Sequence, residues 1–165
     1  MYIGRAVDWE QVVLASWIRS AGGKLLPKTE MWRPLPTGVC WFECRMEPAD
    51  IPKCFVIGSR DWRELFGCTH LSTIAANSFQ GEDNYSHHSR IHAMKRILAS
   101  GDFFEPLILT AFSGEGPFVI IDGNHRAIAL LQLNLLAGQR LFVGFHPRMG
   151  QDFFWFQRSI LLPGM

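Results

Sequence analysis

Residues 119–131 (VIIDGNHRAIALL) carry the side chains best suited to chemistry in this chain. Asp122 ends an apolar, β-rich run, and Gly123 leads into a helical pattern. A strand that passes through glycine into a helix N-terminus directs several backbone N–H groups at one place, which suits an anion such as phosphate. Gly123 permits close approach of a phosphate to the backbone, and the guanidinium of Arg126 can bind phosphate oxygens through two parallel hydrogen bonds. This turn therefore predicts phosphate chemistry.

Three side chains of the turn admit a structural as well as a chemical interpretation. His125 can transfer a proton near neutral pH, or it can be a half-buried structural histidine. Asp122 can hold a metal ion bound to phosphates, act as a base, or cap the following helix. Arg126 precedes an apolar helix, where an unpaired charge is costly, so it requires an anionic partner, either a ligand or a carboxylate.

The pattern of apolar residues predicts an α+β fold around this turn. We expect helices at residues 8–20, 60–67, 91–98 and 127–138, the first capped by Asp8 and the last ended by Gly138. We expect strands within residues 39–46, 54–58, 106–112, 117–121 and 140–146, with a hairpin at SGEG. The polar run 77–88 is predicted to be a surface loop. The spacing of the residues that interrupt helices and strands changes near residue 80. This change indicates an N-terminal α+β extension (1–80) packed on a core (81–165).

Composition excludes several classes of protein. The 165 residues suffice for one domain, and with 48% hydrophobic and 19% charged residues the chain is expected to fold around a large core. A net charge of +1 gives no overall field for nucleic acid. No apolar run reaches the roughly 18 residues that span a bilayer, and the start lacks a secretory signal, so we expect no membrane contact and a cytoplasmic location. The four cysteines are spaced irregularly and do not indicate zinc.

The segment from about residue 90 to 143 resembles the ParB/sulfiredoxin superfamily. The resemblance is carried by RIHAMKRILASGDFFEPLILT, followed by FVIIDGNHRAIALLQL. It implies a small mixed sheet with flanking helices, in which a helix N-terminus after a hairpin strand forms the anion site. It also implies a nucleotide, ATP or another, bound with Mg²⁺, whose phosphates contact Gly123, Asn124, His125 and Arg126. Asp122 would be a metal ligand.

The same resemblance implies a role at the nucleotide site for the ionisable segment 82–96 (EDNYSHHSRIHAMKR). In the superfamily, the helix before the hairpin lies across the nucleotide site. Arg90 and His87 would then contact phosphates, and Glu82 would be a base or a metal ligand. The alternative is a solvated loop and helix face, which is the usual state of charged residues.

The residues of the turn also indicate which branches of this superfamily the chain resembles. Sulfiredoxins carry a catalytic cysteine where this chain has Asn124, so sulfinic acid reduction is not expected. The short segment after the last expected strand leaves no room for a helix-turn-helix reader. The turn looks most like that of stand-alone ParB-like nucleases or nucleoside triphosphatases and of a free-amino-acid kinase.

The function expected from these observations is hydrolysis of phosphate ester or anhydride bonds, with Asp122, His125 and Glu82 as catalytic residues. A small-molecule kinase and a non-catalytic nucleotide- or partner-binding switch remain the alternatives. The expected partner is a nucleotide, with DNA as a further candidate. The aromatic segment 153–156 (FFWF) is a candidate site for a protein partner.

Overall fold

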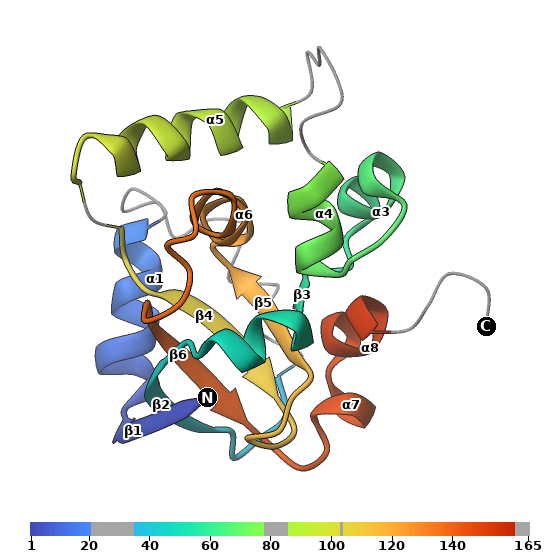
Figure 1. Ribbon diagram of the computed structural model, residues 1–165. Helices are drawn as coiled ribbons and strands as arrows, with labels where there is room; N and C mark the ends of the chain where they lie inside the picture. Colours follow the sequence, from blue (N-terminus) through green and yellow to red (C-terminus); the bar gives the residue numbers. More distant parts are fainter. Residues whose placement is uncertain (21–34, 78–85, 103, 161–165) are drawn as a thin grey trace.

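The computed structural model describes residues 1–20, 35–77, 86–102 and 104–160. The described strands form one mixed sheet of six strands in the order β1-β2-β6-β4-β5-β3 (Figure 1). Their bounds are β1 Tyr2–Val7, β2 Cys40–Arg45, β3 Cys54–Val56, β4 Leu107–Ala111, β5 Phe118–Asp122 and β6 Arg140–Phe145. The expected α+β class is therefore confirmed.

Helices lie on both faces of this sheet. They are the π-helix η1 Trp9–Leu14, α1 Ala15–Ser20, the 3-10 helix η2 Pro48–Lys53, α3 Arg60–Phe66, α4 Leu71–Asn77, α5 Ser86–Ala99, α6 Asn124–Gln132, α7 Met149–Asp152 and α8 Phe154–Ile160. Within the described ranges, no helix is both long enough and apolar enough to cross a bilayer.

The centre of the sheet is built from the second half of the chain, and its edges come from the first half. β4 and β5 form the antiparallel hairpin expected around SGEG, and β6 runs parallel to β4. β2 pairs antiparallel with β6, while β3 pairs parallel with β5 at the opposite edge. Strands from both sides of residue 80 therefore share one hydrogen-bonded sheet.

The central strands are apolar on both faces because helices cover both. Along β5, Phe118 and Ile120 belong to the core beneath α4, α5 and α6, whereas Val119 and Ile121 belong to the core against η1, α7 and α8. This alternation is the period of two that a strand imposes on its side chains. All five residues of β5 are buried, as is typical of a strand between two helical layers.

Several local predictions are confirmed, and several elements of the structure were not predicted. Asp8 caps the first helical segment, its Oδ1 accepting from the backbone N–H of Gln11 at 2.7 Å. Strand β1 and helices η2 and α4 were not expected from the sequence. His87 and His88, placed by the sequence in a surface loop, lie on the first turn of α5, and both are buried.

Helix α6 ends earlier than predicted. The apolar pattern suggested a helix as far as Gly138, but Asn134 adopts a left-handed conformation with φ of 58° and stops it. The N–H of Leu135 donates to the carbonyl of Leu130 at 2.8 Å, and the N–H of Asn134 donates to that of Leu131 at 3.0 Å. This pair of bonds defines a Schellman cap, in which asparagine can replace the usual glycine.

The aromatic segment 153–156 is largely internal. Phe153 and Phe156 are buried in the core, whereas Phe154 is exposed. α8, which contains Phe154 and Phe156, packs closely on the start of α3, because the N–H of Gly58 donates to Oγ of Ser159 at 2.7 Å. Docking of a protein partner on this segment stays a prediction, and the exposed ring of Phe154 is the part of it open to such a contact.

Candidate functional site

The turn 122–126 joins β5 to α6 through a glycine in the left-handed region. Gly123 has φ of 90° and ψ of 22° and occupies the cap position of α6. The alternative that Asp122 caps this helix is therefore wrong, since its side chain turns to Arg126 instead. The expected order of hairpin strand, glycine turn and helix N-terminus is present, so the first-turn N–H groups of α6 emerge beside the end of β5.

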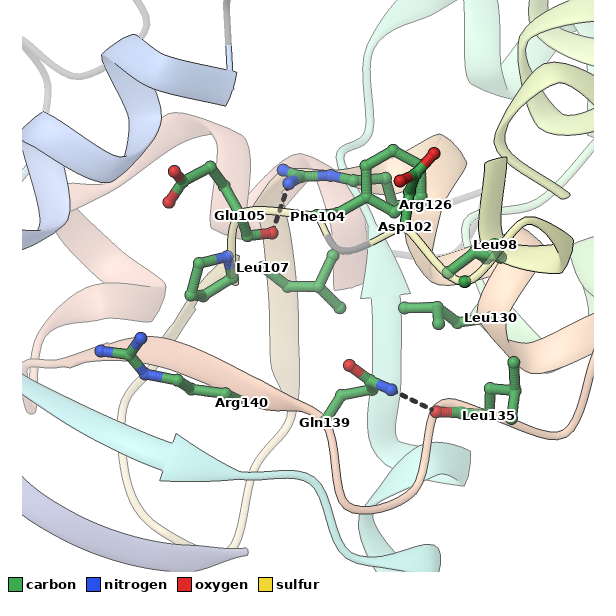
Figure 2. A pocket seen from close by; sticks show the side chains of 12 residues that line it. Leu98, Asp102, Phe104, Glu105, Leu107, Arg126, Leu130, Leu135, Gln139 and Arg140 are labelled. Carbon is green, nitrogen blue, oxygen red and sulfur yellow. Dashed lines mark hydrogen bonds between the residues drawn. The ribbon is translucent and has the colours of Figure 1, made fainter. Parts of the chain in front are cut away.

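Arg126 is anchored inside the protein. Its Nη2 donates to Oδ2 of Asp122 at 2.7 Å, and its Nη1 donates to the main-chain carbonyl of Glu105 (Figure 2). Burial lowers the pKa of the Arg126 guanidinium, while the carboxylates of Asp122 and Glu105 act in the opposite direction. Of the two partners that the sequence left open for this arginine, a carboxylate is the one present.

Gly123 is required by the position of this arginine as well as by its own backbone. A Cβ built on Gly123 would lie 2.5 Å from Cδ2 of Leu107 and 2.8 Å from Nη2 of Arg126. Real Cβ atoms do not approach other atoms so closely. The guanidinium therefore folds back over the glycine, and the turn and the ion pair form one unit.

Asn124 connects the turn to the first half of the chain. Its buried side-chain Oδ1 accepts a hydrogen bond from the N–H of Ile57 at 3.1 Å. Ile57 lies in the connection between β3 and α3, so this bond fixes α6 beside α3. The side-chain oxygen of Asn124 is thus engaged within the fold, while its main-chain N–H lies in the first turn of α6.

His125 and His87 meet between α6 and α5. Nε2 of His125 lies 2.7 Å from Nδ1 of His87, and Nε2 of His87 lies 3.0 Å from Oδ2 of Asp61 on α3. The two imidazole planes differ by 19°, and their centroids are 4.9 Å apart. Because a ring centroid lies about 1.2 Å from each nitrogen, the centroid separation is close to its largest possible value, the N···N distance plus two ring radii. The rings therefore lie edge to edge in nearly one plane, as an in-line hydrogen bond requires.

The direction of this hydrogen-bonded chain follows from the acceptor at its end. An ionised Asp61 can only accept, so Nε2 of His87 carries a hydrogen. Nδ1 of a neutral His87 must then accept, so Nε2 of His125 carries a hydrogen and Nδ1 is the basic atom of His125. The chain Asp61–His87–His125, which we call the histidine relay, thus selects one tautomer of His125.

Neighbouring groups hold the relay in place. The indole of Trp62 packs against both imidazoles, with ring centroids 4.4 Å from His87 and 5.0 Å from His125. Partial burial works against the ionised form of Asp61, but the hydrogen bonds that it accepts from Ser59 and His87 lower the pKa of Asp61 overall. Asp61 is therefore a carboxylate near neutral pH, which is the state that the relay needs.

The remaining predicted site residues are Arg90 and Glu82. Arg90 is exposed on α5, and Glu82 lies outside the described residues. Among the residues that the structure describes, no three His, Cys, Asp or Glu side chains are grouped so that they could hold a metal ion. Asp122 already pairs with Arg126, so its carboxylate does not fit the role of a metal ligand that the resemblance implies. Mg²⁺ at nucleotide sites takes much of its coordination from phosphates and water.

Sequence reasoning missed Asp61 and Trp62. An aspartate near the start of a predicted helix is usually explained by the helix dipole, and a tryptophan by the core. The signal that could have found Asp61 is its place two residues after Ser59, at the start of the predicted helix 60–67. Nothing local indicates that α3 and α5 pack together.

Comparisons of the chain with protein-family models, with curated proteins and with solved structures found no match.

Proposed function

We propose that the protein is a nucleotide-binding enzyme of the ParB/sulfiredoxin-like type that hydrolyses phosphate ester or anhydride bonds. The observation that carries the proposal is the histidine relay, because it places a tautomerically defined imidazole at the N-terminus of α6. Helix N-termini attract phosphate, and a histidine beside the phosphate can act as general acid or base. The sequence resemblance of the turn to that superfamily supports the same conclusion.

In this proposal His125 is the catalytic residue. Its Nδ1 accepts the proton of the attacking water, and the resulting positive charge is stabilised through His87 by the carboxylate of Asp61. His87 and Asp61 are positioning residues, since they act through His125. The first turn of α6, including the main-chain N–H groups of Asn124 and Arg126, holds the phosphate.

The side chain of Arg126 has a different role in this proposal from the one expected. Its guanidinium is tied to Asp122 and to the carbonyl of Glu105, so it fixes the turn and contributes positive charge behind the phosphate rather than a bidentate clamp. A small-molecule kinase would need a base, for which Glu105 is a candidate because it lies just before β4. The carboxylate of Glu105 is engaged within the fold, since it accepts from Oγ of Ser16 at 2.8 Å and from Nε of Arg19 at 2.6 Å.

Phosphate release tests this proposal. Purified protein is incubated with ATP, GTP, CTP or linear DNA and Mg²⁺, and compared with the variants His125→Asn, His87→Phe and, as a matched control, His92→Asn on the exposed side of α5. We expect hydrolysis to fall about 10²–10⁴-fold in His125→Asn, as for the loss of a general base, and to be unchanged in His92→Asn. Equal rates in His125→Asn and the parent would contradict the assignment.

His87→Phe keeps an aromatic ring against Trp62 but removes the hydrogen bonds. Without these bonds the tautomer of His125 is no longer fixed, so we expect kcat to fall while KM stays unchanged, because the main-chain phosphate site is intact. An unchanged kcat with a raised KM would contradict the positioning role of His87.

A non-catalytic nucleotide-binding switch is the second candidate. The observation that favours it is the internal pairing of Arg126, which leaves that guanidinium without a vacant bidentate face. Calorimetry with the same nucleotides distinguishes the two: binding without phosphate release above background would support the switch, and His125→Asn would then weaken binding without any effect on turnover.

A further inference from the structure

A pocket lies beside Arg126, away from the edge-to-edge histidines. It has a volume of about 630 Å³ and is bounded by the end of α5, the segment before β4, α6 and the turn before β6 (Figure 2). Pockets that bind small molecules generally fall between about 300 and 1,000 Å³. We call this cavity the Arg126 pocket.

The walls of the Arg126 pocket are mainly aliphatic. Leu98 comes from α5, Leu107 from β4 and Leu130 from α6, and their side chains face the same space as that of Leu135 (Figure 2). The Schellman cap brings Leu135 back beside Leu130, and Nε2 of Gln139 donates to the carbonyl of Leu135 at 2.9 Å. The cap and this bond hold the outer wall in one conformation, so the pocket is preformed.

Three of the four charged side chains that line the pocket, those of Glu105, Arg126 and Arg140, are paired within the protein, whereas Asp102 is exposed and accepts from Oγ of Ser100 at 3.0 Å. Glu105 pairs with Arg19, and Arg140 donates to both carboxylate oxygens of Glu43 at 2.8 and 3.1 Å. The walls also carry acidic and basic side chains in equal number, namely Asp102 and Glu105 against Arg126 and Arg140. An ionic ligand would lose its hydration in this pocket, and the exposed carboxylate of Asp102 compensates a cation little because water screens its charge.

Arg126 supplies a buried hydrogen-bond donor beside the leucine side chains of the pocket. Its side chain is nine-tenths buried, and its described bonds to Asp122 and to the carbonyl of Glu105 use Nη2 and Nη1. A guanidinium has five N–H groups, so these two bonds leave further donor capacity on a side chain that lines the pocket. A neutral acceptor oxygen can use that capacity without displacing Asp122.

We propose that the Arg126 pocket binds a small, mostly apolar and uncharged molecule that carries an acceptor oxygen. Apolar walls supply the affinity, and the guanidinium of Arg126 orients the acceptor. None of the relay residues lines this pocket, although it shares Arg126 with the proposed phosphate site at the first turn of α6.

Three probes of equal ring size and different charge test the proposal on the unaltered protein. Benzamide, benzoate and benzylamine are titrated separately while the leucine methyl resonances are followed by NMR. We expect benzamide to shift the leucine resonances of the pocket saturably, and benzoate and benzylamine to bind at least about tenfold more weakly because they are ions. Benzoate or benzylamine binding as tightly as benzamide would overturn the neutral ligand class, and no saturable shift with any probe would overturn the pocket.

A pocket-filling variant gives an independent test. Leu135 is exposed, so Leu135→Trp is expected to fold while its indole enters the cavity, weakening benzamide binding about tenfold. Ile3→Trp, an equally exposed apolar position on β1, is the matched control and should retain the affinity of the parent. Circular dichroism establishes that both variants fold. Unchanged benzamide affinity in folded Leu135→Trp would place the probe elsewhere and overturn the proposal.

Discussion

His87 and His125 lie edge to edge in nearly one plane, with Nδ1 of the first 2.7 Å from Nε2 of the second. Two neutral imidazoles in this arrangement share one hydrogen, so the tautomer of each determines that of the other. Asp61 fixes the order from its end, which gives a distant carboxylate control over the basic atom of His125.

Replacing Asp61 by asparagine is expected to lower stability near neutral pH. The folded pKa of Asp61 lies below its ordinary value of 3.8. Such a carboxylate stabilises the fold above the unfolded pKa, and this contribution is lost as the pH falls through the lower folded value. The difference in urea midpoint between Asp61→Asn and the parent should therefore shrink below pH 3.8. Glu115→Gln, an exposed carboxyl, is the control, and a difference that grows at low pH would contradict the linkage.

Gly123→Ala is expected to destabilise the protein by about 2 kcal/mol or more, measured by urea unfolding. The cost has two parts, because an alanine Cβ disfavours φ of 90° and would also collide with Leu107 and Arg126. Gly138→Ala separates the two parts of this cost, because Gly138 has φ of 79° but no atom lies within 4 Å of a Cβ built on it. That control should cost only about 1 kcal/mol, and equal costs at the two positions would remove the steric argument.

Asp122→Ala should destabilise by about 3–5 kcal/mol, because it leaves the buried guanidinium of Arg126 without its carboxylate. Arg126→Met alone leaves the opposite charge unpaired. The double variant Asp122→Ala/Arg126→Met leaves neither, so it should be less destabilised than the sum of the single variants. Chemical denaturation of the four proteins completes the cycle, and simple additivity would show that the pair is not coupled.

The cysteines are expected to react with a colorimetric disulfide reagent in separate phases. Burial raises the pKa of Cys54 to about 12 and that of Cys44 to about 11, so neither presents a thiolate in the folded protein. Cys40 is exposed and should react first, and Cys40→Ser should remove that phase. Cys44 and Cys54 should react only as the protein unfolds. A single fast phase for all four thiols would contradict this burial.

The sequence predicted those features whose structure depends on a few neighbouring residues. The β4–β5 hairpin, the glycine turn at Gly123 and the Asp8 cap depend on a few neighbouring residues, and each was predicted. The end of α6 was missed although Asn134 is a local signal, because an uninterrupted apolar pattern outweighed one asparagine.

The histidine relay could be predicted only in part. His125 and His87 were candidates from the sequence and from its resemblance, but their contact depends on how α5 packs on α6. Asp61 joins them only because α3 reaches the same place, and no sequence spacing indicates a contact between residues 61 and 87. Tertiary packing decides which of several ionisable side chains meet.

The strand order also bears on the synthesis of the protein. β2 leaves the ribosome long before β6, its partner in the sheet, and β3 precedes β5 in the same way. At about 5–20 residues per second, the first strands wait for several seconds before their neighbours exist. During that interval β2 has only β1 to pair with, and an isolated two-stranded ribbon is marginal in water. The nascent chain therefore exposes the apolar residues of β3 until β5 emerges and those of β2 until β6 emerges, and this is the period in which a chaperone would protect it.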